Sequence, residues 1–201
     1  MKTLLLPMLL LMAGTAYTQE DYTLHVDGKT LKVSLDKKYE VVINGKKVSL
    51  FITANDTLTY DDEYVHFLYP KGFSISGTKV EEGIEQVTII NAEGSGVLIQ
   101  SYSSFDPSML NELMLSEITK ESISYGYKLK REDYKLVIGD GKEIEVKKAV
   151  LTYKDEINVY EIASHGKKDE GALVITMRMN SDKNSQGQKL IELMWKTLKF
   201  K

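Results

Sequence analysis

Alternating apolar and polar positions dominate the chain and predict a protein built mainly from short β-strands. Within residues 22–59 the alternation is interrupted at Asp27-Gly28 and again at Asn44-Gly45. Both dipeptides accept positive φ angles and suit the type I′ turns of tight hairpins, so this part predicts two β-hairpins. The hairpins are similar in sequence at an offset of 17 residues. Two copies are too few for a repeat protein, so the similarity reflects either a duplicated hairpin or shared turn chemistry.

From about residue 63 onward, the pattern predicts strands, a helix, four further strands and a closing helix. The first helix is expected to begin at Asp106, which can cap its first turn, with Pro107 where a missing N–H costs nothing. Apolar residues then recur at every fourth position, and Gly126 suits the C-terminal end. The strands are expected at about residues 64–69, 86–90, 97–102, 134–138, 143–153, 158–164 and 172–179.

The closing helix has a capped start and one apolar face. Ser185 and Gln188 have the spacing of a capping box. In the strand at 172–179 one face is fully apolar, whereas the other also carries Thr176 and Arg178. The connections between strands have hairpin length, so the fold class is predicted as α+β, a mainly antiparallel sheet flanked by two main helices with an N-terminal β-hairpin appendage. The apolar face of the closing helix consists of Leu190, Ile191, Met194, Trp195 and Leu198.

The first residues have the features of a secretory signal peptide. Lys2 provides a positive start, residues 4–12 form a short apolar stretch, and residues 13–16 are small. The apolar stretch is far shorter than the roughly 20 residues that span a bilayer, so a membrane anchor is the less favoured interpretation. We therefore expect residues 1–18 to be removed and the mature protein to be exported to the periplasm or the medium, without stable membrane insertion.

The mature chain is expected to consist of two parts joined by a polar linker. Residues 19–62 form the hairpin appendage and the linker, and residues 63–201 form the main domain. The triplet that begins at Asn55 also fits a glycosylation sequon, and Thr57 fits a short O-glycosylation pattern. A plain turn is the favoured interpretation, because matches of three residues are mostly due to chance.

Composition and charge exclude several classes of function. The formal net charge of −3 gives no basic surplus for binding nucleic acid. The chain has no cysteine, which excludes disulfides, a cysteine nucleophile and a lipidated cysteine. The three histidines lie far apart in the sequence, so no metal site and no cofactor are expected. Gly94-Ser95-Gly96 is only a partial match to a serine hydrolase motif, and its glycines more simply suit a turn; no catalytic residue is assigned.

An aromatic and basic segment follows the first helix and is the candidate partner-binding surface. Tyr127, Arg131 and Tyr134 are its main residues, and tyrosine and arginine are common anchors in protein interfaces. The alternative is purely structural: cations at a helix end suit the helix dipole, and a strand with solvated faces follows.

The main domain resembles the PsbP-like proteins at both of its ends. Residues 67–75 read FLYPKGFSI and are similar to the F-x-Y-P-x-G-F start of that family. Residues 191–200 resemble its last helix and terminal S-x-x-F element, with Thr197 in place of the usual serine. The resemblance covers about residues 63–201 and implies an α/β/α sandwich. That fold serves several binding roles, so the resemblance implies a non-enzymatic module without naming its partner.

Three functions follow from these observations. The favoured hypothesis is a secreted or periplasmic, non-enzymatic binding or accessory module that contacts an unknown protein partner. The alternative is a carrier that holds an apolar small molecule between helix and sheet, which would need a connected apolar cavity. A third hypothesis is a hydrolase in which Asp or Glu residues from different strands converge, recognisable by a carboxylate pair in a cleft.

Overall fold

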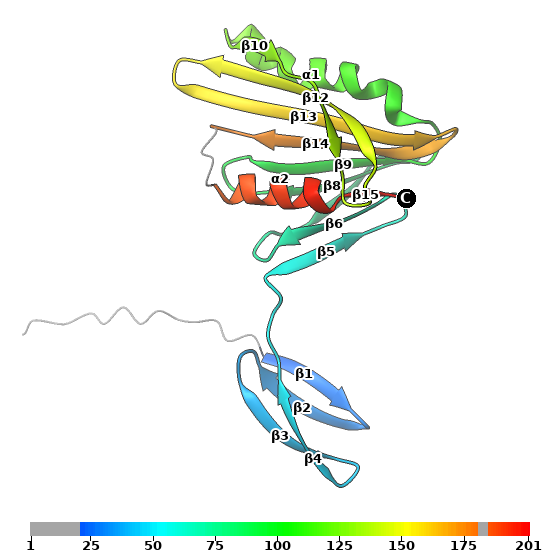
Figure 1. Cartoon of the computed structure of the whole chain (residues 1–201), viewed down its shortest axis with the longest axis vertical. Helices are drawn as coiled ribbons and strands as arrows, with labels where there is room; N and C mark the ends of the chain where they lie inside the picture. Colours follow the sequence, from blue (N-terminus) through cyan, green and yellow to red (C-terminus); the bar gives the residue numbers. More distant parts are fainter. Residues whose placement is uncertain (1–20, 181–184) are drawn as a thin grey trace, which may run out of the picture. The chain divides into compact units, whose positions relative to one another are not determined.

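A computed structural model describes residues 21–180 and 185–201, which divide into two compact units, one up to Ala54 and one from Asn55 to Lys201. The predicted signal peptide at residues 1–18 lies outside the described residues. In the first unit, two antiparallel hairpins follow one another (Figure 1). Their strands are β1 (Asp21–Val26), β2 (Lys29–Ser34), β3 (Lys38–Ile43) and β4 (Lys46–Phe51).

The turns of both hairpins confirm the predicted geometry. Asp27 and Gly28 have φ angles of 49° and 75°, and Asn44 and Gly45 have 50° and 76°. Two consecutive positive φ angles define a type I′ turn, which is why an Asn or Asp followed by Gly is found here. The two copies of the sequence pattern therefore adopt the same local structure.

The second unit is built around an eight-stranded antiparallel sheet in the order β10-β12-β13-β14-β9-β8-β7, with β11 also paired with β12 (Figure 1). A smaller sheet has the order β15-β6-β5. The strands of the large sheet are β7 (Ser76–Glu81), β8 (Ile84–Ile90), β9 (Gly96–Tyr102), β10 (Lys128–Arg131), β11 (Tyr134–Val137), β12 (Glu143–Tyr153), β13 (Glu156–Lys167) and β14 (Glu170–Arg178). Those of the small sheet are β5 (Thr57–Asp61), β6 (Val65–Pro70) and β15 (Lys199–Phe200).

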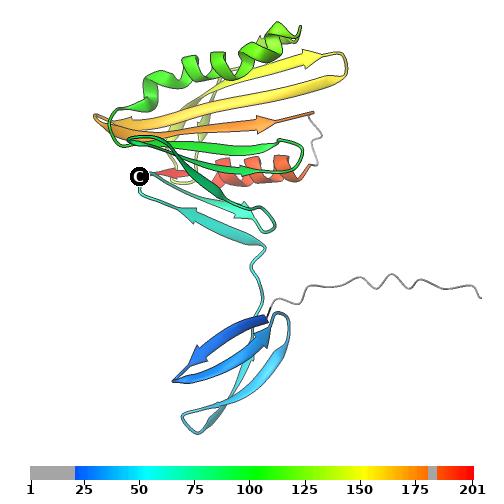
Figure 2. The same cartoon turned by 180° about the vertical axis from the view of Figure 1, so that it is seen from behind.

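Helices cover both faces of the large sheet, which confirms the predicted α+β class (Figures 1 and 2). A short 3₁₀ turn, η1 (Pro107–Leu110), leads into α1 (Asn111–Ser124), and Asp106 caps it by accepting from the Ser108 amide at 2.8 Å. The closing helix is α2 (Gln186–Thr197), whose Ser185 accepts from the Gln188 amide at 3.1 Å. Both caps were expected from the sequence. None of the helices among the described residues is long and apolar enough to cross a membrane.

Alternate residues of β14 belong to two separate hydrophobic cores. Leu173 and Ile175 face α1 and pack with Leu115, whereas Ala172 and Val174 face α2. The second core, between the large sheet, α2 and the small sheet, includes fully buried residues from all three: Phe67, Ile89, Val97, Val146, Leu190, Met194 and Leu198. The strand at 172–179 is therefore covered on both faces, and each face has its own helix.

Several elements differ from the sequence-based expectation, because β5, β7, β10 and β15 were not predicted as strands. The expected linker ending at residue 62 contains β5, which pairs antiparallel with β6, Leu58 lying opposite Tyr69. The Tyr60 ring packs 5.2 Å from the Phe67 ring, so this segment is part of the second unit. Five strands rather than four separate the helices, because β10 pairs with β12 although its sequence KLKR lacks an apolar alternation.

Candidate functional site

A polar cavity of about 170 Å³ lies between α2 and the large sheet. Its floor is formed by Lys148, Glu161, Thr176 and Arg178 from β12, β13 and β14, and Tyr134 of β11 lies at its edge. Helix α2 contributes Gln188, Ile191, Glu192 and Trp195. The cavity therefore combines charged groups of both signs with two aromatic rings.

The floor is polar because three polar side chains meet in one row across the sheet. Lys148 lies opposite Glu161, and Glu161 lies opposite Thr176 on the next strand. Residues directly opposite one another in antiparallel strands share a face of the sheet. Along the same face the neighbouring positions, Ala163 and Val174, are apolar and fully buried. The polar row is thus a local interruption of a hydrophobic surface.

Glu161 is the centre of this arrangement. Its carboxylate accepts hydrogen bonds from the Tyr134 hydroxyl at 3.1 Å, the Trp195 Nε1–H at 3.1 Å and the Thr176 hydroxyl at 3.2 Å. The ammonium group of Lys148 lies 4.0 Å away, and the Glu161 side chain is only 14% exposed. Burial, together with the negative charge of Glu161, raises the pKa of the Tyr134 hydroxyl. Three neutral donors and one cation therefore satisfy a carboxylate that is largely removed from water.

Arg178 is less completely satisfied. Its Nη1 donates to Gln188 Oε1 at 2.6 Å, and the Gln188 amide group in turn donates to Glu192. The Nε atom of Arg178 is enclosed and has no hydrogen-bond partner in the part of the chain that the structure describes. Within that part, Arg178 also forms no ion pair with a carboxylate.

Close backbone packing fixes α2 above this floor. A Cβ atom on Gly187, in the first turn of α2, would lie 2.4 Å from Ser95 Cβ, and one on Gly139 would lie 2.7 Å from the backbone of Thr197. Ser95 also accepts from the Met179 amide at 2.9 Å, which ties the β8–β9 turn to the end of β14. These contacts explain Gly94-Ser95-Gly96 as a structural turn and set the distance between helix and floor.

The predicted partner-binding residues Tyr127, Arg131 and Tyr134 do not form one surface. Tyr127 packs against the core on the α1 side and donates a hydrogen bond to Glu156. Tyr134 packs against the core on the α2 side. In the register along β12, Lys128 lies opposite Thr152 and Tyr134 opposite Val146, so several residues separate them. Only Tyr134 belongs to the cavity.

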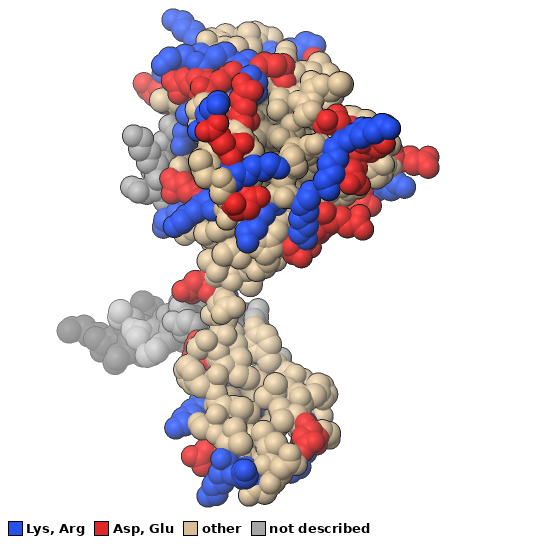
Figure 3. Space-filling model, turned by 45° about the vertical axis from the view of Figure 1, so that its right-hand side comes forward, with Lys and Arg blue, Asp and Glu red and all other residues tan. Residues whose placement is uncertain are grey.

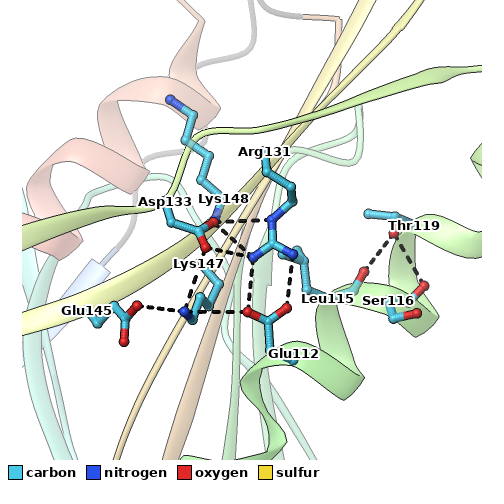
Figure 4. Close-up of polar contacts among 9 residues, drawn as sticks. All are labelled: Glu112, Leu115, Ser116, Thr119, Arg131, Asp133, Glu145, Lys147 and Lys148. Atoms are coloured by element: carbon cyan, nitrogen blue, oxygen red, sulfur yellow. Dashed lines mark hydrogen bonds and ion pairs between the residues drawn. The ribbon is translucent and has the colours of Figure 1, made fainter.

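Arg131 takes part in a charged network on the α1 side (Figure 4). Its Nη1 and Nη2 donate to the Glu112 carboxylate at 2.9 and 3.1 Å, and Nη2 also bonds Asp133 at 2.8 Å. Lys147 lies 3.4 Å from Glu112 and 2.6 Å from Glu145. This geometry supports the structural interpretation of Arg131, in which the residue joins α1 to β10 and β12. Its role in binding a partner stays a prediction.

Positive and negative side chains lie next to one another on the face of the second unit that Figure 3 shows. Among residues 21–180 and 185–201, no three His, Asp or Glu side chains gather in a way that could hold a metal ion. His66, one of the three histidines, donates from Nδ1 to the Asp61 carboxylate at 2.8 Å at the end of the small sheet.

The cavity was missed at the sequence level, although a signal for it exists. Glu161 alternates with Val159 and Ala163, so a carboxylate occupies the inward face of a strand that is otherwise apolar. The partly polar face of β14, with Thr176 and Arg178, was recognised. What the sequence does not contain is the strand register that brings Glu161 and Thr176 side by side.

Comparison with known proteins adds little information about this cavity. No family model and no curated protein matches the chain. Among solved structures, the chain is similar to the solution structure of cyanobacterial PsbP (CyanoP) from Synechocystis sp. PCC 6803, with 9% sequence identity and a TM-score of 0.44. The match covers 75% of this chain and 95% of that chain. A likeness at this level assigns neither a family nor a function to the protein.

Proposed function

We propose that the protein is an exported, non-enzymatic binding module that acts by contact with a protein partner, and that the cavity beside Tyr134 receives part of that partner. The observation that carries this proposal is the composition of the cavity: two aromatic rings and an arginine without an ion pair among the described residues line an accessible polar space. Aromatic and arginine side chains in pockets are the usual anchors of protein interfaces. Export is supported by the signal-peptide pattern of residues 1–18.

The apolar carrier is less well supported. The cavity of about 170 Å³ is smaller than the roughly 300 to 1,000 Å³ typical of small-molecule sites, and charged side chains form its floor. Buried side chains such as Leu190 and Met194 occupy the remaining interface between α2 and the sheet.

A hydrolase with two carboxylates has one feature in its favour. Glu161 and Glu192 line the same cavity, as such an enzyme would require. However, the Glu161 carboxylate already accepts from Tyr134, Thr176 and Trp195. A carboxylate engaged by three donors is suited to holding structure rather than to exchanging protons with a substrate, so binding remains the better supported function.

Site-specific photo-cross-linking in the native host tests this proposal. A photoreactive residue in place of Glu192, an exposed residue at the rim of the cavity, should cross-link a defined protein partner. The matched control is Leu113 on α1, which is 56% exposed and next to Glu112 on the opposite face of the sheet. Cross-linking at position 113 alone would move the interface to the α1 side, where Tyr127 and Arg131 lie. If neither position 192 nor position 113 cross-links a protein, the result would contradict a protein-binding role.

A further inference from the structure

Arg178 forms no ion pair with a carboxylate among the described residues, although Glu161 and Glu192 line the same cavity. Its Nη1 bonds the neutral Gln188 amide, and its Nε is enclosed without a partner. Removing a guanidinium from water without a counter-charge is costly, and an incoming anion would offset that cost. Glu161 lines the same cavity, but among the described residues its ion pair is with Lys148 and not with Arg178.

We propose that the cavity binds a carboxylate group of the partner, with Arg178 as its counter-ion; this proposal rests on the proposed function. Because Nη1 is engaged by Gln188, Nη2 and the enclosed Nε are left for the ligand, and a carboxylate reaches Nε only when the side chains that enclose it shift. Together, Nε and Nη2 carry two parallel N–H groups, which match the two oxygens of a carboxylate. Two sources on the partner offer such a carboxylate group: the C-terminus, and the side chain of an aspartate or glutamate.

Charge and size favour a carboxylate over a phosphate. The cavity also contains the negatively charged Glu161 and Glu192, which would repel a dianion more strongly than a monoanion. Lys148 is shared with Glu132 at 3.4 Å and Glu161 at 4.0 Å, so Arg178 is the one cation of the cavity lining that has no acidic partner among the described residues. A volume of about 170 Å³ suits an end group of a chain rather than a whole drug-sized molecule.

Fluorescence of Trp195 provides a direct assay, because it is the single tryptophan of the chain and lines the cavity. The probes are three synthetic peptides added to the purified mature protein: acetyl-Gly-Gly-Leu with a free carboxylate, the same peptide amidated, and acetyl-Gly-Asp-Gly amide. We expect a saturable change in Trp195 fluorescence with a carboxylate-bearing peptide and no change with the neutral amide. Binding of the first peptide indicates a C-terminal carboxylate, and binding of the third indicates an acidic side chain.

Variants of Arg178 and of one cation outside the cavity sharpen the test. Arg178→Gln should weaken carboxylate binding about tenfold or more, the usual loss for a hydrogen bond to a charged group. Arg178→Lys keeps the charge but loses the paired donors, so it should weaken binding less and serves if the first variant is unstable. Lys120→Gln, at a position on α1 where the side chain is 72% exposed, should bind as the wild type does. Equal binding of the amidated peptide, no response to any peptide at millimolar concentration, or wild-type affinity in both Arg178 variants would overturn the proposal.

The two proposals fail in different ways. A partner cross-linked at position 192 whose binding is unaffected by Arg178→Gln would remove the carboxylate but keep the binding module. Carboxylate peptides that bind through Arg178, with no partner cross-linked in the host, would support the site but contradict the role in protein contact.

Discussion

Glu161 connects three elements at the floor of the cavity by hydrogen bonds. Through Tyr134 it holds β11, through Thr176 it holds β14, and through Trp195 it holds α2. Hydrogen bonds to a buried charged group contribute more to stability than bonds between neutral groups, because the group cannot fall back on water. A single side chain on β13 therefore stabilises the joint between sheet and closing helix.

Substitution of this carboxylate is expected to destabilise the protein clearly. In Glu161→Gln all three donors lose their charged acceptor, and the hydrogen bonds on the side of the amide NH₂ group must reverse or break. The expected loss is about 1–3 kcal/mol in the free energy of unfolding, measured by urea denaturation. Glu145→Gln is the control, because that side chain is 63% exposed and its pair with Lys147 should contribute less than about 1 kcal/mol. Equal effects of both substitutions would contradict the role given to Glu161.

His165 is expected to make stability depend on pH. Burial, and then the positive charge of Lys142, lowers the pKa of His165 below its ordinary value of 6.5. In the unfolded chain the imidazole takes up a proton near that value, whereas in the folded protein it does so only at lower pH. Stability should therefore fall as the pH drops through 6.5 and level off below the folded pKa. An NMR titration gives the folded pKa, and His165→Asn should reduce the slope of stability against pH; a folded pKa above 6.5 would contradict this.

At the scale of elements, the seating of α2 depends on Gly187. A methyl group there would lie 2.4 Å from Ser95 Cβ, so Gly187→Ala must displace the first turn of the helix or the β8–β9 turn. Overpacking of this kind typically costs about 1–3 kcal/mol. The matched control is Gln186→Ala, at an exposed position one residue earlier in the same turn. Thermal melting of both variants tests the contact, and a neutral or stabilising Gly187→Ala would show that α2 does not depend on close packing there.

Local signals predicted the helices well and the edge strands poorly. Asp106 caps the 3₁₀ turn that leads into α1, and Ser185 caps α2, as their sequence positions indicate, because capping needs only neighbouring residues; α1 itself begins at Asn111 without a side-chain cap. Gln188 has the spacing of a capping box, yet the side-chain amide bonds Arg178 and Glu192 instead. Strands β5, β10 and β15 have two to five residues and are defined by their pairing partners rather than by their own alternation. The cavity could not be predicted for the same reason, since only the strand register brings Glu161 and Thr176 together.

For the whole molecule, the start of the second folding unit can be measured with two fragments. Because β5 pairs with β6 and Tyr60 packs on Phe67, a fragment beginning at Asn55 should fold on its own. A fragment beginning at Glu63 lacks β5 and exposes an edge of β6, so its melting temperature should be lower. Circular dichroism melts of both fragments check this. A fragment from Asn55 that is unfolded would show that the hairpins of the first unit are required.

Processing of the N-terminus is a second prediction at this scale. The short apolar stretch followed by small residues in positions 13–16 predicts cleavage after about residue 16 to 18. The intact mass of the protein from the periplasm or medium should show that loss. Full-length protein retained in a membrane fraction would contradict export as a soluble module.

The central claim is that the protein recognises a carboxylate of its partner through Arg178, and arginine side-chain NMR tests it most directly. The chain contains two arginines, so protein labelled with ¹⁵N-arginine gives two Nε–H signals. Arg131, which is already paired with Glu112 and Asp133, is the internal control. Addition of the peptide with a free carboxylate should shift the Arg178 signal in a saturable manner and leave Arg131 unchanged. Two unchanged signals, or equal shifts of both, would contradict the claim.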